Sequence, residues 1–482
     1  MDYIENRTYD EIEIGSSASL KRRLTTADIQ LFAVMSGDVN PAHLDEEYAK
    51  SDMFHKIIAH GMWGGSLVST VLGTQLPGPG TIYLSQTFKF KRPVAVGDEI
   101  TVMVTAVEKD NERKRVKFDC QCVNQNGEPV IVGEALVLAP THKVKRPRAS
   151  LPAVRLHDPG AQYRRLIAKT QGLAPIRMAV VQPVDAFALR GAVEAAEAGL
   201  IVPVLVGAET ELRAAAETAK IDLSPYILVP AEHSRHAARR AVELAREGKV
   251  DALMKGSLST ETLMLEVVSK TAGLLTGRRI SHVAVVDVPG RDRPIFLTDA
   301  AININPTLEH KRDIVQNAID LARVLGIEQP KVAILSAIET ISPRLVSTID
   351  AAALCKMANR GQITGGIVDG PLAFDDAIST AAAEAKNIRS AVGGQADILV
   401  APDLESGTML TKQLEYLADA QAADVVVGAR APIVLTSRAD VPLARQASCA
   451  VAVLLAHHKM AEQTGLAIVA ARENRVPWTE EF

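Results

Sequence analysis

The chain has 482 residues, more than one ordinary hydrophobic core can use, so two or three domains are expected. The net charge of −4 is small, and no arginine-rich or aromatic-interleaved stripe appears, which argues against nucleic-acid binding. The four cysteines form no CxxC pair, no apolar run reaches the roughly 18 residues that span a bilayer, and no signal peptide is recognisable, so a cytoplasmic protein without a membrane partner is expected.

The first part of the chain, residues 1–140, is predicted to be an α+β domain. A first helix should end near Gly37, and a longer helix should begin at His60 and Gly61. Strand patterns follow within residues 81–94, 98–108, 113–125 and 128–140. One long helix followed by consecutive antiparallel strands favours a sheet wrapped about that helix.

The loop after the first helix carries an acid, an amide, a proline and a histidine within six residues. Asp38 and His43 stand five apart, and Pro41 fixes one backbone torsion between them. A surface turn explains each residue singly, whereas a proton-transfer pair would use both side chains. Gly61 adds a backbone N–H at a helix start, where an oxyanion can be received. Adding water to an α,β-unsaturated thioester requires these groups.

The motifs GDVNPAH, IIAHGMWGGSLVS and LPGPGTIYLSQTFKFKRPVAVGDEI carry a resemblance. Over residues 10–140 the chain resembles the MaoC-like, (R)-specific enoyl-CoA hydratases of the hotdog fold. The resemblance implies that Asp38 and His43 are the catalytic pair and that the Gly61 N–H polarises the thioester carbonyl. It also implies that Asn40 orients the loop and that the hotdog sheets dimerise.

Two further residues of the long predicted helix are candidates for substrate binding. The family keeps a small polar residue near the site at the position of Ser66. Trp63 stands where the family often has a smaller apolar residue. If Trp63 points into the acyl pocket, the acyl chain should be short; the alternative is that it packs in the core or in a dimer interface.

Residues 141–160 are basic and rich in proline, and we interpret them as a linker, with contact to ligand phosphates as an alternative. From there to the end, apolar strand-like runs alternate with alanine-rich helices. The alternation predicts an α/β domain, residues 161–482, with parallel sheets and two lobes about a cleft. Ligands bind at the carboxyl ends of parallel strands, so the polar turns after these runs should form the site.

The most informative of these turns contains Ser437 and Arg438, with Asp440 two residues after Arg438. Arg438 offers a planar fork for phosphate and Ser437 a hydroxyl donor, while Asp440 could take a thiol proton. A helix cap or a surface ion pair is the alternative explanation. Weaker candidates for substrate binding, chosen by loop position only, are Lys255, Asp299 and Arg344.

Over about residues 160–470 the chain resembles the phosphate acetyltransferase and phosphate butyryltransferase family. The motifs are DALMKGSLST, FLTDAAININPTLEHKRDIVQNAI, GPLAFDDAIS and APDLESGTMLTKQLEYLADAQAADVVVGARAPIVLTSRAD. The resemblance implies two lobes, a homodimer, and acyl transfer between CoA and orthophosphate, with Ser437 and Arg438 as the family's Ser-Arg pair. The acetyl branch has its presumed base farther downstream, where Ala444 stands here, so Asp440 is the nearby substitute.

The sequence therefore predicts a bifunctional, homo-oligomeric acyl-CoA enzyme. Its activities would be hydration of trans-2-enoyl-CoA to (R)-3-hydroxyacyl-CoA and reversible acyl transfer between CoA and orthophosphate. CoA thioesters, CoA and phosphate are the expected substrates, with no metal or other cofactor. One alternative is a hydratase whose C-terminal domain acts as an acyl-CoA sensor or assembly module. Another is a hotdog thioesterase, which predicts thiol release without phosphate.

Overall fold

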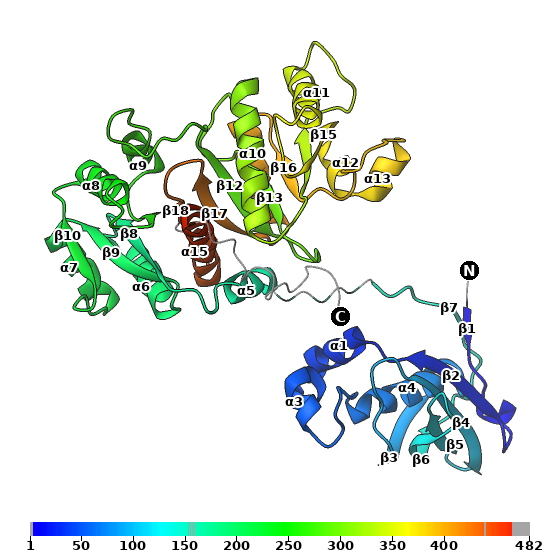
Figure 1. The fold of residues 1–482 in the computed structure, drawn as a ribbon. Helices are drawn as coiled ribbons and strands as arrows, with labels where there is room; N and C mark the ends of the chain where they lie inside the picture. The colour runs from blue at the N-terminus through cyan, green and yellow to red at the C-terminus, as the bar shows by residue number, and fades with distance from the viewer. Residues whose placement is uncertain are drawn as a thin grey trace. The chain divides into compact units, whose positions relative to one another are not determined.

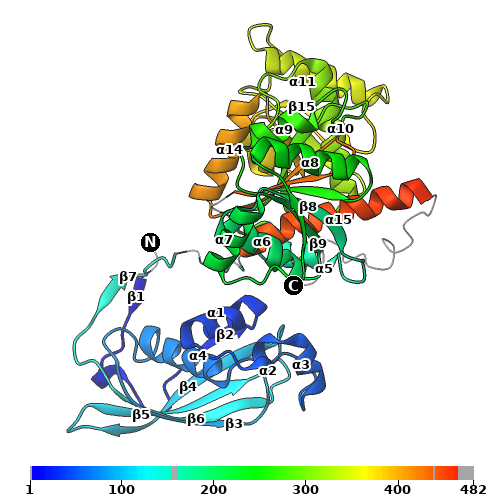
Figure 2. The same cartoon turned by 90° about the vertical axis from the view of Figure 1, so that its left-hand side faces the viewer.

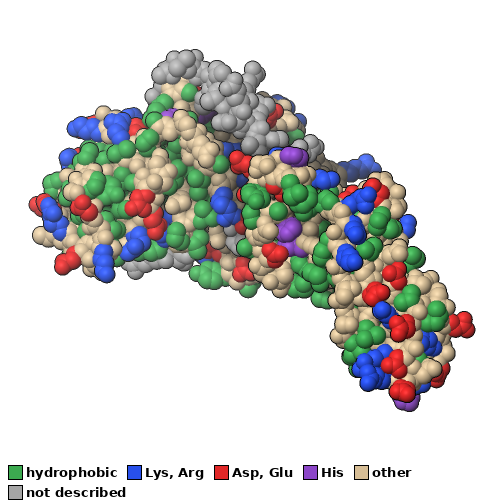
Figure 3. Space-filling view, turned by 90° about the horizontal axis from the view of Figure 1, so that it is seen from below, with side chains coloured by type: hydrophobic (Ala, Val, Ile, Leu, Met, Phe, Trp, Pro, Cys, Tyr) green, Lys and Arg blue, Asp and Glu red, His purple; other side chains and the backbone are tan. Residues whose placement is uncertain are grey.

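The computed structural model describes residues 3–152, 154, 156, 158, 160–437 and 440–464. The chain divides between residues 156 and 157 into two compact units (Figure 1). Among the residues described, no helix combines the length and the apolar character that a membrane span requires. Acidic and basic side chains are interspersed on the face shown in Figure 3, in keeping with the small net charge.

The first unit is a five-stranded antiparallel sheet against which a long helix packs (Figure 2). The strand order is β2-β4-β5-β6-β3. The strands are β2 (Ser17–Arg23), β3 (Ile82–Phe90), β4 (Glu99–Asp110), β5 (Arg115–Val123) and β6 (Pro129–Leu138). The helices are η1 (Tyr9–Glu11), α1 (Thr26–Ser36), α2 (Pro41–Leu44), α3 (Glu46–Ser51) and the long α4 (Gly61–Thr74). This is the predicted α+β hotdog arrangement.

Strand β2, which the sequence did not predict, has the largely polar sequence SASLKRR. Its backbone pairs with β4 along its whole length, although only two of its seven residues are apolar. Hydrophobic alternation cannot detect such a strand, because its place depends on backbone hydrogen bonds to a neighbour. Strand β5, in contrast, follows the predicted period of two, with Val116, Phe118, Cys120 and Cys122 all buried.

The segment predicted as a linker, residues 141–160, begins inside the first unit. Its residues Lys145–Pro147 form β7, which pairs with β1 (Tyr3–Glu5) in an antiparallel ribbon. The buried side chain of Asn6 ties the ribbon to the unit: its Nδ2 donates to two main-chain carbonyls, and its Oδ1 accepts from the Val144 N–H at 2.9 Å. A buried amide needs all these partners, so the chain follows the first unit beyond its predicted end.

The second unit holds one sheet of eleven strands in the order β10-β9-β8-β11-β18-β17-β12-β13-β16-β14-β15. The strands are β8 (Ile176–Val181), β9 (Ile201–Gly207), β10 (Ile227–Pro230), β11 (Ala252–Lys255), β12 (Ser281–Asp287), β13 (Ile295–Thr298), β14 (Lys331–Leu335), β15 (Ile367–Leu372), β16 (Ile398–Val400), β17 (Gln421–Val427) and β18 (Ile433–Leu435).

The helices of this unit are α5 (Ala161–Ala168), α6 (Ala186–Glu197), α7 (Glu209–Ala219), α8 (Ser234–Arg246), α9 (Thr260–Val267), α10 (Leu308–Val324), α11 (Val346–Asn359), α12 (Phe374–Ile378), α13 (Thr380–Ala385), α14 (Leu404–Leu417) and α15 (Pro442–Thr464). The strands on both flanks are parallel, as predicted. The centre differs, because β12–β13 and β17–β18 are hairpins and β17 also runs antiparallel to β12. Two consecutive strands that are joined by a short loop can pair only in the antiparallel sense, because a parallel pair needs a long crossover connection.

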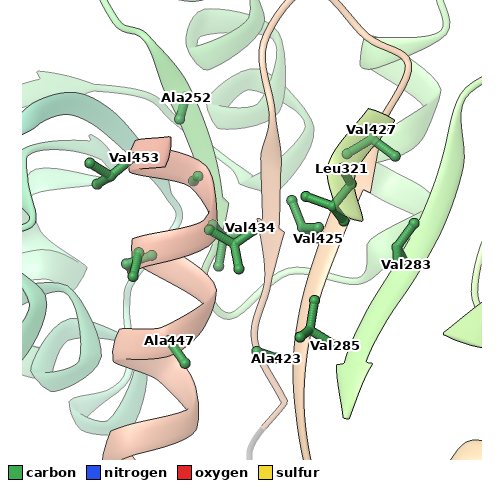
Figure 4. Close-up of a cluster of buried hydrophobic side chains, with 14 of the residues drawn as sticks. Ala252, Val283, Val285, Leu321, Ala423, Val425, Val427, Val434, Ala447 and Val453 are labelled. Atoms are coloured by element: carbon green, nitrogen blue, oxygen red, sulfur yellow. The ribbon is translucent and has the colours of Figure 1, made fainter. Parts of the chain in front are cut away.

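The largest core cluster of the second unit extends across the sheet, and Figure 4 shows the part of it at this antiparallel centre. Side chains of β12, β17 and β18 meet those of α10 and α15 there, and all are buried. The labelled members include Val283, Val285, Val425, Val427, Val434, Leu321, Ala447 and Val453. Small aliphatic side chains suit a sheet covered on its faces, which explains the low aromatic content of the sequence.

We predict that Asn6→Ala destabilises the first unit by about 1–3 kcal/mol, because the buried groups that it bridges lose their partners. Urea unfolding followed by Trp63 fluorescence measures this, in a Trp478→Phe background that leaves one of the two tryptophans. Asn126→Ala, at an exposed turn of the same unit, is the matched control. Equal midpoints for the two variants would contradict the assigned role of Asn6.

Candidate active sites

The loop between α1 and α2 presents Asp38 and His43, and its shape is set by local capping. Gly37 ends α1 with φ of 75°, a conformation that residues with side chains rarely adopt. Asn40 caps α2, and its Oδ1 accepts from the Ala42 N–H at 3.2 Å. Asn40 thus shapes the loop between the two predicted catalytic side chains.

Asp38 and His43 face a common space, which they share with His60. One carboxylate oxygen of Asp38 and one ring nitrogen from each histidine lie within 4.8 Å of one another. The Nδ1 atom of His43 lies 2.9 Å from the carbonyl oxygen of Ile58. Because a carbonyl only accepts hydrogen bonds, Nδ1 carries the proton and Nε2 keeps a lone pair. His43 is therefore held in a tautomer that can accept a proton.

Gly61 is the first residue of α4, and its N–H finds no acceptor within the described ranges, as is usual in a first helical turn. An added Cβ at Gly61 would lie 2.9 Å from a ring carbon of Phe90 on β3. The glycine therefore also makes room for a neighbouring strand, a packing reason that the sequence did not suggest.

Trp63 and Ser66 lie on α4 in different surroundings, one in the core and the other at the surface. Trp63 is 6% exposed and belongs to the core cluster of the first unit, the second of its two alternatives. Ser66 is exposed, and its hydroxyl donates to the Trp63 carbonyl at 2.7 Å, one helical turn back. Burial of Trp63 explains why a large side chain is accommodated there without an acyl ligand.

In the second unit, a cavity of about 310 Å³ lies beyond the carboxyl ends of β8, β11 and β18. Two loops predicted to form a site meet there, since the Thr436 hydroxyl donates to the Lys255 carbonyl at 2.8 Å. The lining residues are Asp185, Phe187, Ala188, Lys255, Gly256, Ser257, Leu258, Ser259 and Thr436. Lys255 is thus brought next to the segment that contains Ser437.

Ser437 and Asp440 are joined directly, because the Ser437 N–H donates to Oδ2 of Asp440 at 2.7 Å. Arg438 lies outside the described residues. Burial raises the pKa of Asp440 to about 6; the neighbouring carboxylates of Asp424 and Glu415 also raise this pKa, and the Ser437 N–H opposes them. A carboxyl that titrates near neutrality beside the predicted phosphate-binding serine suits proton transfer.

Arg445, which sequence reasoning missed, holds this loop in place. Its guanidinium is buried, donating to the Asp440 carbonyl at 2.8 Å and to the Glu194 carboxylate at 2.6 Å. It also lies over the ring of Phe187, 4.4 Å from the ring centroid. The sequence could have indicated Arg445, because it is the single charged residue in the first turns of α15, directly after Ala444.

Asp299 and Arg344 are not brought to this site. Asp299 is buried, and its carboxylate accepts from the main-chain N–H groups of Ala301 and Ile302 and from the Asn303 side chain. These hydrogen bonds hold the loop after β13. Arg344 is exposed between β14 and α11. It lines neither the cavity described above nor a second one of about 580 Å³ beside β14 and β16.

Family models match both units. The model described as "MaoC like domain" matches residues 10–125, and that described as "Phosphate acetyl/butaryl transferase" matches residues 230–443. The chain is 56% identical over 303 residues to a phosphate acetyltransferase from Rhizobium meliloti, covering 63% of this chain and 96% of that protein. It is 41% identical over 297 residues to a phosphate butyryltransferase from Clostridium acetobutylicum, covering 62% and 99%.

Solved structures resemble the two units in turn. A branched-chain phosphotransacylase from Enterococcus faecalis is 29% identical, covers 58% of this chain and 99% of its own, and superposes with a TM-score of 0.52. An R-hydratase from Pseudomonas aeruginosa is 42% identical and covers 32% of this chain and 99% of its own, with a TM-score of 0.31. The chain belongs to the phosphate acetyl/butyryltransferase family through its second unit, and its first unit is a MaoC-like hotdog domain.

Proposed function

We propose that the protein is a bifunctional enzyme, an (R)-specific enoyl-CoA hydratase joined to a phosphate acyltransferase. The observation that carries the hydratase assignment is the grouping of Asp38 and His43 within 4.8 Å of each other, with His43 Nε2 left as a proton acceptor. The transferase assignment is supported by Ser437 and Asp440 lying next to the cavity that Lys255 lines. The sequence identity to the relatives named above supports both assignments.

In the hydration, a water molecule held by Asp38 and His43 attacks C3 of the enoyl thioester. The Nε2 atom of His43 takes one proton of this water, and the Asp38 carboxylate accepts a hydrogen bond from the other. The Gly61 N–H stabilises the enolate oxygen that forms. His43 then returns its proton to C2, so that H and OH add to one face of the double bond and the imidazole is regenerated.

In the acyl transfer, Asp440 takes the proton of the CoA thiol and the sulfur attacks the carbonyl of the acyl phosphate. A thioester bond forms, the carbon–oxygen bond to phosphate breaks, and Asp440 passes its proton to the departing phosphate. Ser437 and Arg438 would bind the phosphate, and holding two polyanions in line supplies proximity. As proposed, both reactions use side chains and main-chain groups of the chain itself.

Self-association is supported by the edge strand β3 of the first unit. Its side chains Ile82, Leu84 and Phe90 are exposed, and an open strand edge can pair with a second copy. We predict that Ile82→Glu combined with Leu84→Glu lowers the mass of the full chain in sedimentation. Ile14→Glu, another exposed apolar position, is the control. An unchanged mass would exclude association through β3.

We predict that Asp38→Asn and His43→Gln each lower crotonyl-CoA hydration by about 10²–10⁴-fold, the typical contribution of acid–base catalysis. Phosphate-dependent acyl transfer by the same variants should be unchanged, because Asp440 belongs to the other unit. Asp10→Asn, whose side chain is 88% exposed, is the matched control. Wild-type hydration in both variants would refute the assigned pair, and thiol release without phosphate would favour a thioesterase.

We predict that acyl transfer between phosphate and CoA falls as the pH drops through about 6, where the raised pKa of Asp440 lies. The base is ionised above this pH and protonated below it, so the rate falls on the acidic side of the pH–rate profile. Asp424→Asn removes a negative charge that raises this pKa, and the limb should move to lower pH. Asp419→Asn, an exposed position, should leave it in place.

If the acidic limb of the pH–rate profile does not move in Asp424→Asn, then Asp440 is not the base. Transfer activity absent at every pH, with hydration intact, would favour the sensor or assembly hypothesis for the second unit.

A further inference from the structure

His60 stands where the three parts of the hydratase site meet, although the mechanism above assigns it no task. It is the N-cap residue of α4 and directly precedes Gly61, whose N–H would receive the enolate oxygen. It is 3% exposed, and its carbonyl accepts from the Trp63 N–H at 2.9 Å. Histidine side chains are usually at least partly exposed to water, so the burial of His60 at the start of the central helix calls for an explanation.

The ring of His60 is anchored to the loop that carries Asp38. Its Nε2 lies 3.1 Å from the main-chain carbonyl oxygen of Asp38, 22 residues earlier in the chain. Since that oxygen can only accept, Nε2 carries the proton and Nδ1 keeps a lone pair. Nδ1 is buried and has no hydrogen-bond partner in the described part of the chain, so the neutral ring fits this site.

The same ring lies against the ring of His43. Their centroids are 4.0 Å apart and their planes are inclined by 36°, and the ring of Phe32 lies with its centroid 4.9 Å from that of His60. A neutral ring in contact at this distance restricts the orientation of His43 and offers a π face to its imidazolium form.

We propose that His60 is a positioning residue of the hydratase site, which acts on Asp38 through its hydrogen bond and on His43 through ring stacking. The inference rests on the proposed hydration. The hydrogen bond holds the backbone that carries the Asp38 carboxylate. The stacked ring keeps Nε2 of His43 directed at the substrate water and stabilises the positive charge that His43 carries between the two proton transfers.

Two substitutions separate these contributions. His60→Gln can keep an N–H donor near the position of Nε2 and removes the ring, whereas His60→Phe keeps a ring and removes the donor. We expect each to lower kcat for crotonyl-CoA hydration about 10- to 100-fold, the effect of a small misplacement of reacting groups, with KM changed less than about threefold. His142→Gln, an exposed position of the same unit, is the matched control.

A second readout does not depend on activity. Solid-state ¹⁵N spectra of the histidine-labelled full chain, with the His43 signals assigned from His43→Gln, report which ring nitrogen is protonated. In wild type we expect His43 protonated at Nδ1 alone. In His60→Gln we expect signals from both tautomers, because the ring that holds His43 against the Ile58 carbonyl is gone.

Wild-type kcat in both variants, or an unchanged His43 tautomer in His60→Gln, would overturn the proposal. Loss of the folded first unit in both variants, seen by circular dichroism and urea unfolding, would assign His60 to stability alone and would overturn it as well. If the wild-type chain does not hydrate enoyl-CoA, the proposed function fails, while the ¹⁵N spectra still decide whether His60 positions His43.

Discussion

A main-chain carbonyl can accept a hydrogen bond but cannot donate one, and the hydratase site depends on this asymmetry. The Ile58 carbonyl requires a proton on Nδ1 of His43, which leaves Nε2 as the acceptor that water needs. The Asp38 carbonyl imposes the corresponding choice on His60. Backbone positions, which the fold sets, thereby select the chemical form of two side chains.

In the second unit, the buried guanidinium of Arg445 holds the loop that carries the candidate base Asp440. Arg445 lies between the Glu194 carboxylate and the Asp440 carbonyl, so the loop after β18 is tied to α6 on the other side of the cavity. Burial beside further carboxylates brings the pKa of Asp440 to about 6, within reach of a proton-transfer role. Asp440, the candidate base, therefore occupies a position that its neighbours hold in place.

Several residues could be interpreted from the sequence only in part. Asp299 follows a strand in a polar turn, the pattern of a ligand-binding aspartate, yet its carboxylate is used by neighbouring donors in its own loop. Trp63 could have lined a pocket or filled the core, and only the packing of α4 against the sheet distinguishes these. A residue type and a loop position identify candidates, but they do not show which groups already occupy a side chain's hydrogen bonds.

The sequence by itself determined the two-domain plan and the α+β and α/β classes of the two units, which follow from hydrophobic periodicity, a local property. The resemblance of its motifs to two families added the hotdog fold and the candidates Asp38, His43 and Ser437, and the turn that holds Ser437 also offered Asp440. Only the tertiary structure revealed the contacts of Asn6, His60 and Arg445, whose partners lie up to 138, 22 and 251 residues away. It also decided the antiparallel centre of the large sheet, because strand pairing depends on neighbours that no local pattern specifies.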